Sequence, residues 1–155
     1  ETVSRHMWRF TREPRRHADL VQDVFVAAFT SLPRYSGRAP FLHWLRKIAV
    51  RTGYAFWRQA RRERAAVPLD EADLGALAAD PAEVTPADAG ERVHRMLQAL
   101  PPRDRLVLSL MYLEEQSVRD IARLLGWTPV MVKVQAWRAR AKLRKVLRLH
   151  EETAL

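Results

Sequence analysis

Residues 127–144, WTPVMVKVQAWRARAKLR, combine cationic and apolar side chains in a pattern that predicts a helix binding another molecule. Thr128 can cap this helix, and Pro129 suits its first position, where no backbone N–H is needed. Apolar side chains that are unusual on a solvated face alternate with five cations. The cations are Lys133, Arg138, Arg140, Lys142 and Arg144.

A helical wheel divides these residues between two sides of the helix. Mostly small residues form a narrow stripe suited to a core: Val132, Ala136, Ala139 and Leu143. The other side carries Val130, Met131, Val134, Trp137 and Arg138. An outward Arg can pair bidentately with guanine, which gives about 1–3 kcal/mol of discrimination, and apolar side chains can contact the methyl group of thymine. Alternatively, the apolar residues pack on another part of the protein or on a partner.

The segments before this helix predict a helix-turn-helix motif. Ser117 and Asp120 form a capping box for a preceding helix, and Gly126 ends that helix. Further upstream, helices are expected from the Thr85-Pro86 cap to Leu100 and over residues 103–113. Helix, tight glycine-containing turn, helix is the arrangement that places a recognition helix in the DNA major groove.

The first half of the chain predicts two further helices. Residues 18–32 are apolar on two faces, one with Leu20 and Val24 and the other with Phe25 and Phe29, so this helix needs two burial partners. Residues 41–62 interleave aromatic and basic side chains, which suits unstacked bases and phosphates. Its outward side is expected to carry Arg46, Lys47, Arg51, Tyr54, Trp57, Arg58, Arg61 and Arg62, although Tyr54 and Trp57 equally suit domain packing.

Charge divides the chain into three parts. Residues 1–64 hold 14 basic and 5 acidic side chains, residues 65–91 hold 7 acidic and no basic ones, and residues 92–155 hold 13 basic and 6 acidic ones. Apolar residues recur at helical spacing throughout, glycine is scarce and β-branched alternation is absent, so the fold is predicted to be all-α. The charge pattern divides it into two small helical domains, 1–64 and 86–155, joined by an acidic flexible linker at 65–85. Two basic domains favour a polyanionic partner.

The remaining composition argues against several classes of function. Cysteine is absent and the five histidines are scattered, so no metal site or cofactor is expected, and a helical enzyme with a small-molecule substrate is disfavoured. No apolar run approaches the roughly 18 residues of a membrane span, and no secretory signal opens the chain. A cytoplasmic protein without membrane insertion is the expectation.

Four stretches of this sequence together resemble a bacterial RNA polymerase sigma factor of the extracytoplasmic-function (ECF) group. They occur in the family's order within residues 18–62 and 92–148. Family members usually have further helix upstream of VSRHMWRFTRE, so a truncated or short N-terminus is expected. The matching stretches are ADLVQDVFVAAFTSLPRYSG, FLHWLRKIAVRTGYAFWRQARR, ALPPRDRLVLSLMYLEEQSVRDIARLLG and VKVQAWRARAKLR.

The resemblance implies a non-enzymatic promoter-specificity subunit that binds core RNA polymerase and promoter DNA and is regulated by an anti-sigma factor. Core polymerase would contact Asp19, Gln22, Asp23, Phe25 and Phe29. The minus-ten element would be bound by a loop, SGRAP, that can cup a flipped base, and by Arg38, Arg51, Tyr54, Trp57, Arg58, Arg61 and Arg62. The minus-thirty-five element would be bound by Arg119, Thr128, Met131, Lys133, Val134, Gln135, Trp137, Arg138 and Arg140. The acidic linker would mimic RNA in the polymerase channel.

Three residues depart from the family pattern. Arg51 stands where Asn is frequent, Met131 where Thr is common, and Val134 where a small polar residue is common. The minus-thirty-five preference is therefore expected to differ, or this face is tuned for a protein partner. The alternative function is a stand-alone helix-turn-helix repressor or activator, which gives no reason for the apolar face around Phe25 and Phe29.

Overall fold

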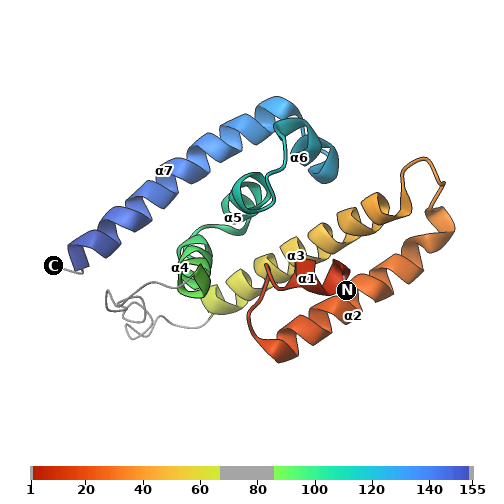
Figure 1. Cartoon of the computed structure of the whole chain (residues 1–155), viewed down its shortest axis with the longest axis horizontal. Helices are drawn as coiled ribbons and strands as arrows, with labels where there is room; N and C mark the ends of the chain where they lie inside the picture. Colours follow the sequence, from red (N-terminus) through yellow and green to blue (C-terminus); the bar gives the residue numbers. More distant parts are fainter. Residues whose placement is uncertain (1, 67–85, 154–155) are drawn as a thin grey trace. The chain divides into compact units, whose positions relative to one another are not determined.

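The computed structural model describes residues 2–66 and 86–153, and every regular element in these two ranges is helical (Figure 1). The all-α prediction is thereby confirmed. The chain divides into two compact units, residues 1–64 and 65–155. Of the linker predicted at 65–85, Ala65 and Ala66 belong to the last turn of a helix, and the rest lies outside the described residues.

The N-terminal unit contains the helices α1 (Thr2–Met7), α2 (Pro14–Ser31) and α3 (Phe41–Ala66), with a 3₁₀ turn, η1 (Leu32–Arg34), after α2. Helices α2 and α3 run antiparallel, side by side (Figure 1). Helix α2 begins four residues earlier than predicted, because Pro14 occupies a first-turn position where its missing N–H costs nothing. The largest contributions to the core come from Met7, Phe10, Leu20, Val24, Val50 and Trp57.

A close approach between Phe10 and Gly53 ties the segment after α1 to the middle of α3. A Cβ atom on Gly53 would lie 2.5 Å from carbons of the Phe10 ring, so only glycine fits there without movement of the ring. The Phe10 and Trp57 rings lie 4.5 Å apart between centroids. Trp57 Nε1 also donates a 2.8 Å hydrogen bond to the Phe10 carbonyl oxygen. This contact therefore provides a hydrogen-bond acceptor for the buried indole N–H and also packs the two rings together.

The C-terminal unit contains α4 (Pro86–Gln98), α5 (Pro102–Leu108), the π-helical turn η3 (Ser109–Leu113), α6 (Val118–Leu125) and α7 (Pro129–Thr153). Helix α7 packs against α4, α5 and α6. The single helix predicted over 103–113 thus changes from α to π winding at Ser109. Helix α4 ends two residues before the predicted Leu100, and its predicted cap, Thr85, lies outside the described residues.

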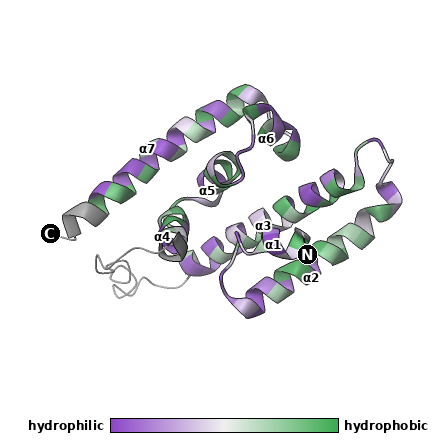
Figure 2. Cartoon of the chain, viewed as in Figure 1, coloured by the Kyte–Doolittle hydropathy of each residue, from purple (hydrophilic) through white to green (hydrophobic). Residues whose placement is uncertain are grey.

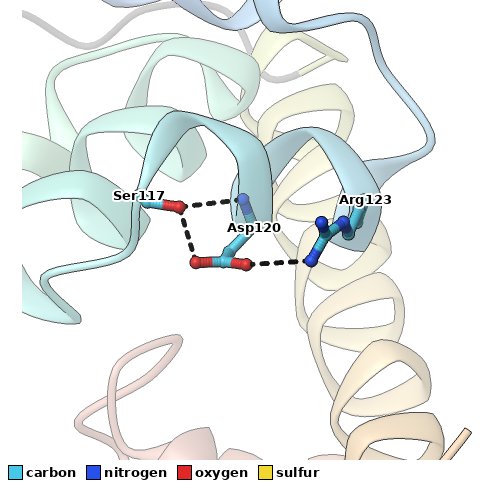
Figure 3. Close-up of polar contacts among 3 residues, drawn as sticks. All are labelled: Ser117, Asp120 and Arg123. Carbon is cyan, nitrogen blue, oxygen red and sulfur yellow. Dashed lines mark hydrogen bonds and ion pairs between the residues drawn. The ribbon is translucent and has the colours of Figure 1, made fainter.

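Local capping fixes both the start of α6 and the turn between α6 and α7, as the sequence predicts. Ser117 Oγ accepts a 3.1 Å hydrogen bond from the Asp120 backbone N–H and donates to the Asp120 carboxylate, which also pairs with Arg123 at 3.6 Å (Figure 3). Gly126 ends α6 with φ of 70°, a left-handed conformation that suits glycine. Thr128 Oγ1 accepts a 3.2 Å bond from Met131 N at the start of α7. The helix-turn-helix is therefore capped at its turn.

Candidate nucleic-acid and protein interfaces

The two sides of α7 differ as the helical wheel predicts. Val132, Ala136 and Ala139 are at most 1 % exposed. The outward side exposes Val130 at 68 % and Trp137 at 63 %, with Met131 and Val134 also exposed. Figure 2 shows the resulting alternation of hydrophobic and hydrophilic bands along α7. We call the outward residues Val130, Met131, Val134, Trp137 and Arg138 the reading face.

Positive charge lies beside the reading face. Residues 129–150 contain no Asp or Glu. Arg140 is held by a 2.9 Å hydrogen bond from its Nη1 to Tyr112 Oη of η3. Such a cationic border suits a polyanion, because each neutralised phosphate releases condensed counterions. The predicted contact residues that are exposed cations here are Arg119, Lys133, Arg138 and Arg140.

Gln135 does not belong to this outward surface, which corrects the sequence prediction. Its Nε2 donates a hydrogen bond to Oδ1 of Asp104, a carboxylate only 1 % exposed. Lys142 Nζ donates to Oδ2 of the same group at 2.6 Å. A buried carboxylate needs such partners, so Gln135 serves the interior. Thr128 remains exposed, but its hydroxyl oxygen accepts the capping bond from Met131.

Helix α2 has the two apolar faces predicted for it. Leu20 and Val24 are buried in the N-terminal unit, whereas Phe25 is 44 % and Phe29 73 % exposed. Val26 and Leu32 extend the exposed face, and the predicted contact residues Asp19, Gln22 and Asp23 are exposed as well. An apolar cluster edged by polar groups is typical of a protein-docking surface.

A groove of about 460 Å³ between α2 and α3 brings together residues predicted for two different partners. Asp23 of α2 and Arg58 and Arg62 of α3 all line it. Tyr54 is half-buried beside them, with Arg58 Cζ 5.8 Å from its ring centroid. Arg51 and Arg61 are exposed on α3, so the basic surface predicted there is present.

Trp57 does not lie on that predicted surface. The sequence placed it on the outward side of α3 and left domain packing as an equal alternative. Trp57 is 5 % exposed and bonded to the Phe10 carbonyl, so the packing alternative holds. The segment after α1 covers this side of α3, and the wheel of α3 alone carries no sign of that cover. Trp57 is a core residue.

The loop between η1 and α3 is closed by Tyr35, a residue that the sequence reasoning missed. Tyr35 Oη donates a 2.6 Å hydrogen bond to the Ala39 carbonyl oxygen, across Gly37 with its φ of 71°. Its ring lies 5.0 Å from that of Trp44 and 5.9 Å from that of Phe41. The aromatic cluster thus fixes a loop that presents Arg38 to solvent. The sequence signal that could have predicted this closure is an aromatic residue just before the glycine-containing loop, Tyr35, with the aromatic residues Phe41 and Trp44 just after it.

Within ranges 2–66 and 86–153, no three His, Asp or Glu side chains gather where they could hold a metal ion. No helix in the described part of the chain is long and apolar enough to cross a membrane.

Two small helical units, one ending in a helix-turn-helix with a basic outward surface, define a class of DNA-binding regulatory proteins. Comparison with known families identifies which family of DNA-binding regulatory proteins this is. Residues 1–63 match the family described as Sigma-70 region 2, and residues 90–143 match Sigma-70, region 4. The chain belongs to the sigma-70 family of RNA polymerase sigma factors, in its ECF group. Sigma factors are regulatory subunits and not enzymes.

Individual relatives agree with this assignment. The protein named Probable RNA polymerase sigma factor RfaY, from Xanthomonas campestris, is 34% identical over 94% of this chain and 38% of its own length. ECF RNA polymerase sigma factor SigD, from Mycobacterium tuberculosis, is 32% identical over 81% of this chain and 60% of its own length. The chain therefore spans less than two thirds of either relative.

A solved structure shows the same fold. It is the sigma factor RpoE from Bartonella quintana in complex with the anti-sigma factor NepR, with a TM-score of 0.62 and 21% sequence identity. The match covers 95% of this chain and 90% of that one.

Proposed function

We propose that this protein is a promoter-specificity subunit that binds core RNA polymerase and directs initiation at a particular set of promoters. The observation that carries the proposal is the exposed apolar face of α2, with Phe25 and Phe29 turned away from the core. A stand-alone repressor or activator would need only the helix-turn-helix and would leave this face without a role. Docking on core polymerase gives the exposed apolar face of α2 a role.

Each of the three partners has its own surface on the protein. Core polymerase binds α2 through Phe25, Phe29 and the neighbouring polar residues Asp19, Gln22 and Asp23. The minus-ten element binds the loop closed by Tyr35 and the basic side of α3, with Arg38, Arg51, Tyr54, Arg58, Arg61 and Arg62. The minus-thirty-five element binds α6 and α7 through Arg119, Lys133, Arg140 and the reading face. The chain itself catalyses nothing, since nucleotide addition belongs to the polymerase.

Regulation by an anti-sigma factor is part of the same proposal. The support is the pair of exposed apolar faces, on α2 and α7, together with the similarity to a sigma factor solved with NepR. A protein that covered both faces would block polymerase and DNA at once. We further propose that the acidic segment 65–85 imitates RNA in the polymerase channel, and that the protein works in the cytoplasm, where its polymerase and DNA partners lie.

Run-off transcription tests the proposal directly. Purified core polymerase is assayed on a promoter pool with and without the protein, and then with Phe25→Ala or Arg138→Ala. We expect specific transcripts that disappear with Phe25→Ala and a changed promoter choice with Arg138→Ala. Val93→Ala, a similar truncation of an exposed apolar residue on α4, is the control and should behave as wild type. No stimulation of transcription, combined with tight duplex binding, would favour the repressor or activator instead.

A further inference from the structure

The centre of the reading face carries apolar and not hydrogen-bonding side chains. Val130, Met131 and Val134 are exposed in the first two turns of α7. In a helix-turn-helix these are the turns that meet base edges in the major groove. Aliphatic side chains have no hydrogen-bond donor or acceptor. Exposed aliphatic groups in this position therefore need an apolar group on the DNA to contact.

Two polar side chains near these residues, Gln135 and Lys142, form hydrogen bonds inside the protein. Gln135 could pair with adenine, but its amide is bonded to buried Asp104. Lys142 is bonded to the same carboxylate. On the reading face itself the groups able to donate to a base are the Arg138 guanidinium and the single indole N–H of Trp137. Discrimination by this helix must therefore come largely from apolar contact.

The surroundings of the reading face favour DNA as its occupant when the protein is not held by an anti-sigma factor. Lys133 and Arg140 border it as exposed cations, and residues 129–150 contain no carboxylate. Charge complementarity thus favours a polyanion whose exposed base edges also offer apolar groups. On the major-groove edges of the four bases, the C5-methyl group of thymine is the apolar group available.

We propose that Val130, Met131 and Val134 read thymine through its C5-methyl group in the minus-thirty-five element, with Arg138 adding a preference for guanine. The inference rests on the proposed function and deepens it, because it names the base chemistry that the C-terminal unit recognises. Val134 lies at the centre of the reading face and makes the principal contact.

Replacement of thymine by deoxyuridine tests this inference, because it removes the methyl group and leaves the pairing and hydrogen-bonding pattern intact. Holoenzyme formed from core polymerase and the full chain first selects duplexes from a random-sequence pool. Each thymine of the selected minus-thirty-five element is then replaced singly, and the Kd of the holoenzyme is measured. Wild type is compared with Val134→Ala and with the control Val93→Ala.

We expect one or more thymines whose replacement raises the wild-type Kd about fourfold, the effect of one buried methyl group. With Val134→Ala the same replacement should change the Kd by less than about twofold, since the methyl has lost its partner. Val93→Ala should keep the full wild-type effect.

Two results would overturn the inference while leaving the proposed function intact. One is selected promoters that tolerate deoxyuridine at every position. The other is an equal deoxyuridine effect in wild type and Val134→Ala. Failure of the holoenzyme to select any duplex or to initiate transcription would count instead against the proposed function.

Discussion

Lys142 Nζ lies 2.6 Å from Asp104 Oδ2, and the two partners differ sharply in exposure: the lysine side chain is 50% exposed and the aspartate 1%. The carboxylate stands in the first turn of α5 and the ammonium on α7. With Gln135 on its other oxygen, Asp104 holds α7 at two points two turns apart. The rotation of the reading face relative to the rest of the unit is thereby fixed.

The unequal burial predicts unequal costs for removing either partner. Lys142→Met leaves the buried carboxylate with Gln135 alone, so we expect a loss of about 3 kcal/mol in the free energy of unfolding. Asp104→Asn leaves an ammonium that can turn to water, and we expect about 1 kcal/mol. Urea denaturation of the full chain, followed by circular dichroism, measures both. Lys145→Met, on the exposed side of α7, is the matched control. A larger loss for Asp104→Asn would contradict the interpretation.

Gly53 and Gly90 are both helical glycines, but their surroundings predict opposite effects of alanine. At Gly53 the new Cβ would meet the Phe10 ring at 2.5 Å, and we expect Gly53→Ala to destabilise the protein by about 1–3 kcal/mol. At Gly90 nothing lies within 4 Å, so Gly90→Ala should stabilise it by about 0.5–1 kcal/mol through helix propensity. Thermal unfolding of the two variants gives the comparison. A stable Gly53→Ala protein would show that Phe10 can move without cost.

Tyr35→Phe separates the loop-closing hydrogen bond from the aromatic packing. The ring contacts with Phe41 and Trp44 remain, but the bond to the Ala39 carbonyl is lost. We expect a small change in stability, about 0.5–1 kcal/mol, and a relaxed preference at the minus-ten element. Transcription from templates varied at single minus-ten positions measures that preference. Tyr112→Phe, which removes a hydroxyl from the C-terminal unit, should leave minus-ten preference unchanged.

His6 gives the stability of the protein a dependence on pH. Burial lowers the pKa of His6, and the charges of Arg9, Arg46 and Arg5 lower it further, against the opposing effect of its hydrogen bond to the Thr2 carbonyl. In acid the unfolded chain takes up a proton at the ordinary pKa while the folded chain resists it, so stability is lost as pH falls below about 6.5. We expect the fall in Tm between pH 7.5 and 5.5 to be smaller in His6→Gln than in wild type. An identical fall in both proteins would show that His6 makes no such contribution.

The features predictable from sequence were those encoded within one helix. The wheel of α7 separates Val132 from Val134 without any knowledge of what each side meets, and the wheel of α2 does the same for Val24 and Phe25. Caps are equally local, so Ser117 could be identified from its neighbours three residues away.

The errors arose where a distant segment determines the role of a residue. Trp57 is buried because Phe10, 47 positions earlier, covers it, and Gln135 turns inward because Asp104 lies 31 positions away. Neither partner is implied by helical periodicity. The ring position of Tyr35 depends in the same way on how its loop folds back toward α3.

The division of α7 into two sides also bears on how such a protein can diversify. Its packing depends on Val132, Ala136 and Ala139 and on the two bonds to Asp104. Substitutions at exposed positions away from such contacts usually change stability by less than about 0.5 kcal/mol. Positions 130, 131, 134 and 138 are therefore free to vary at little cost to folding. A few exchanges on this side would alter what α7 recognises while the packing against α4, α5 and α6 stays the same.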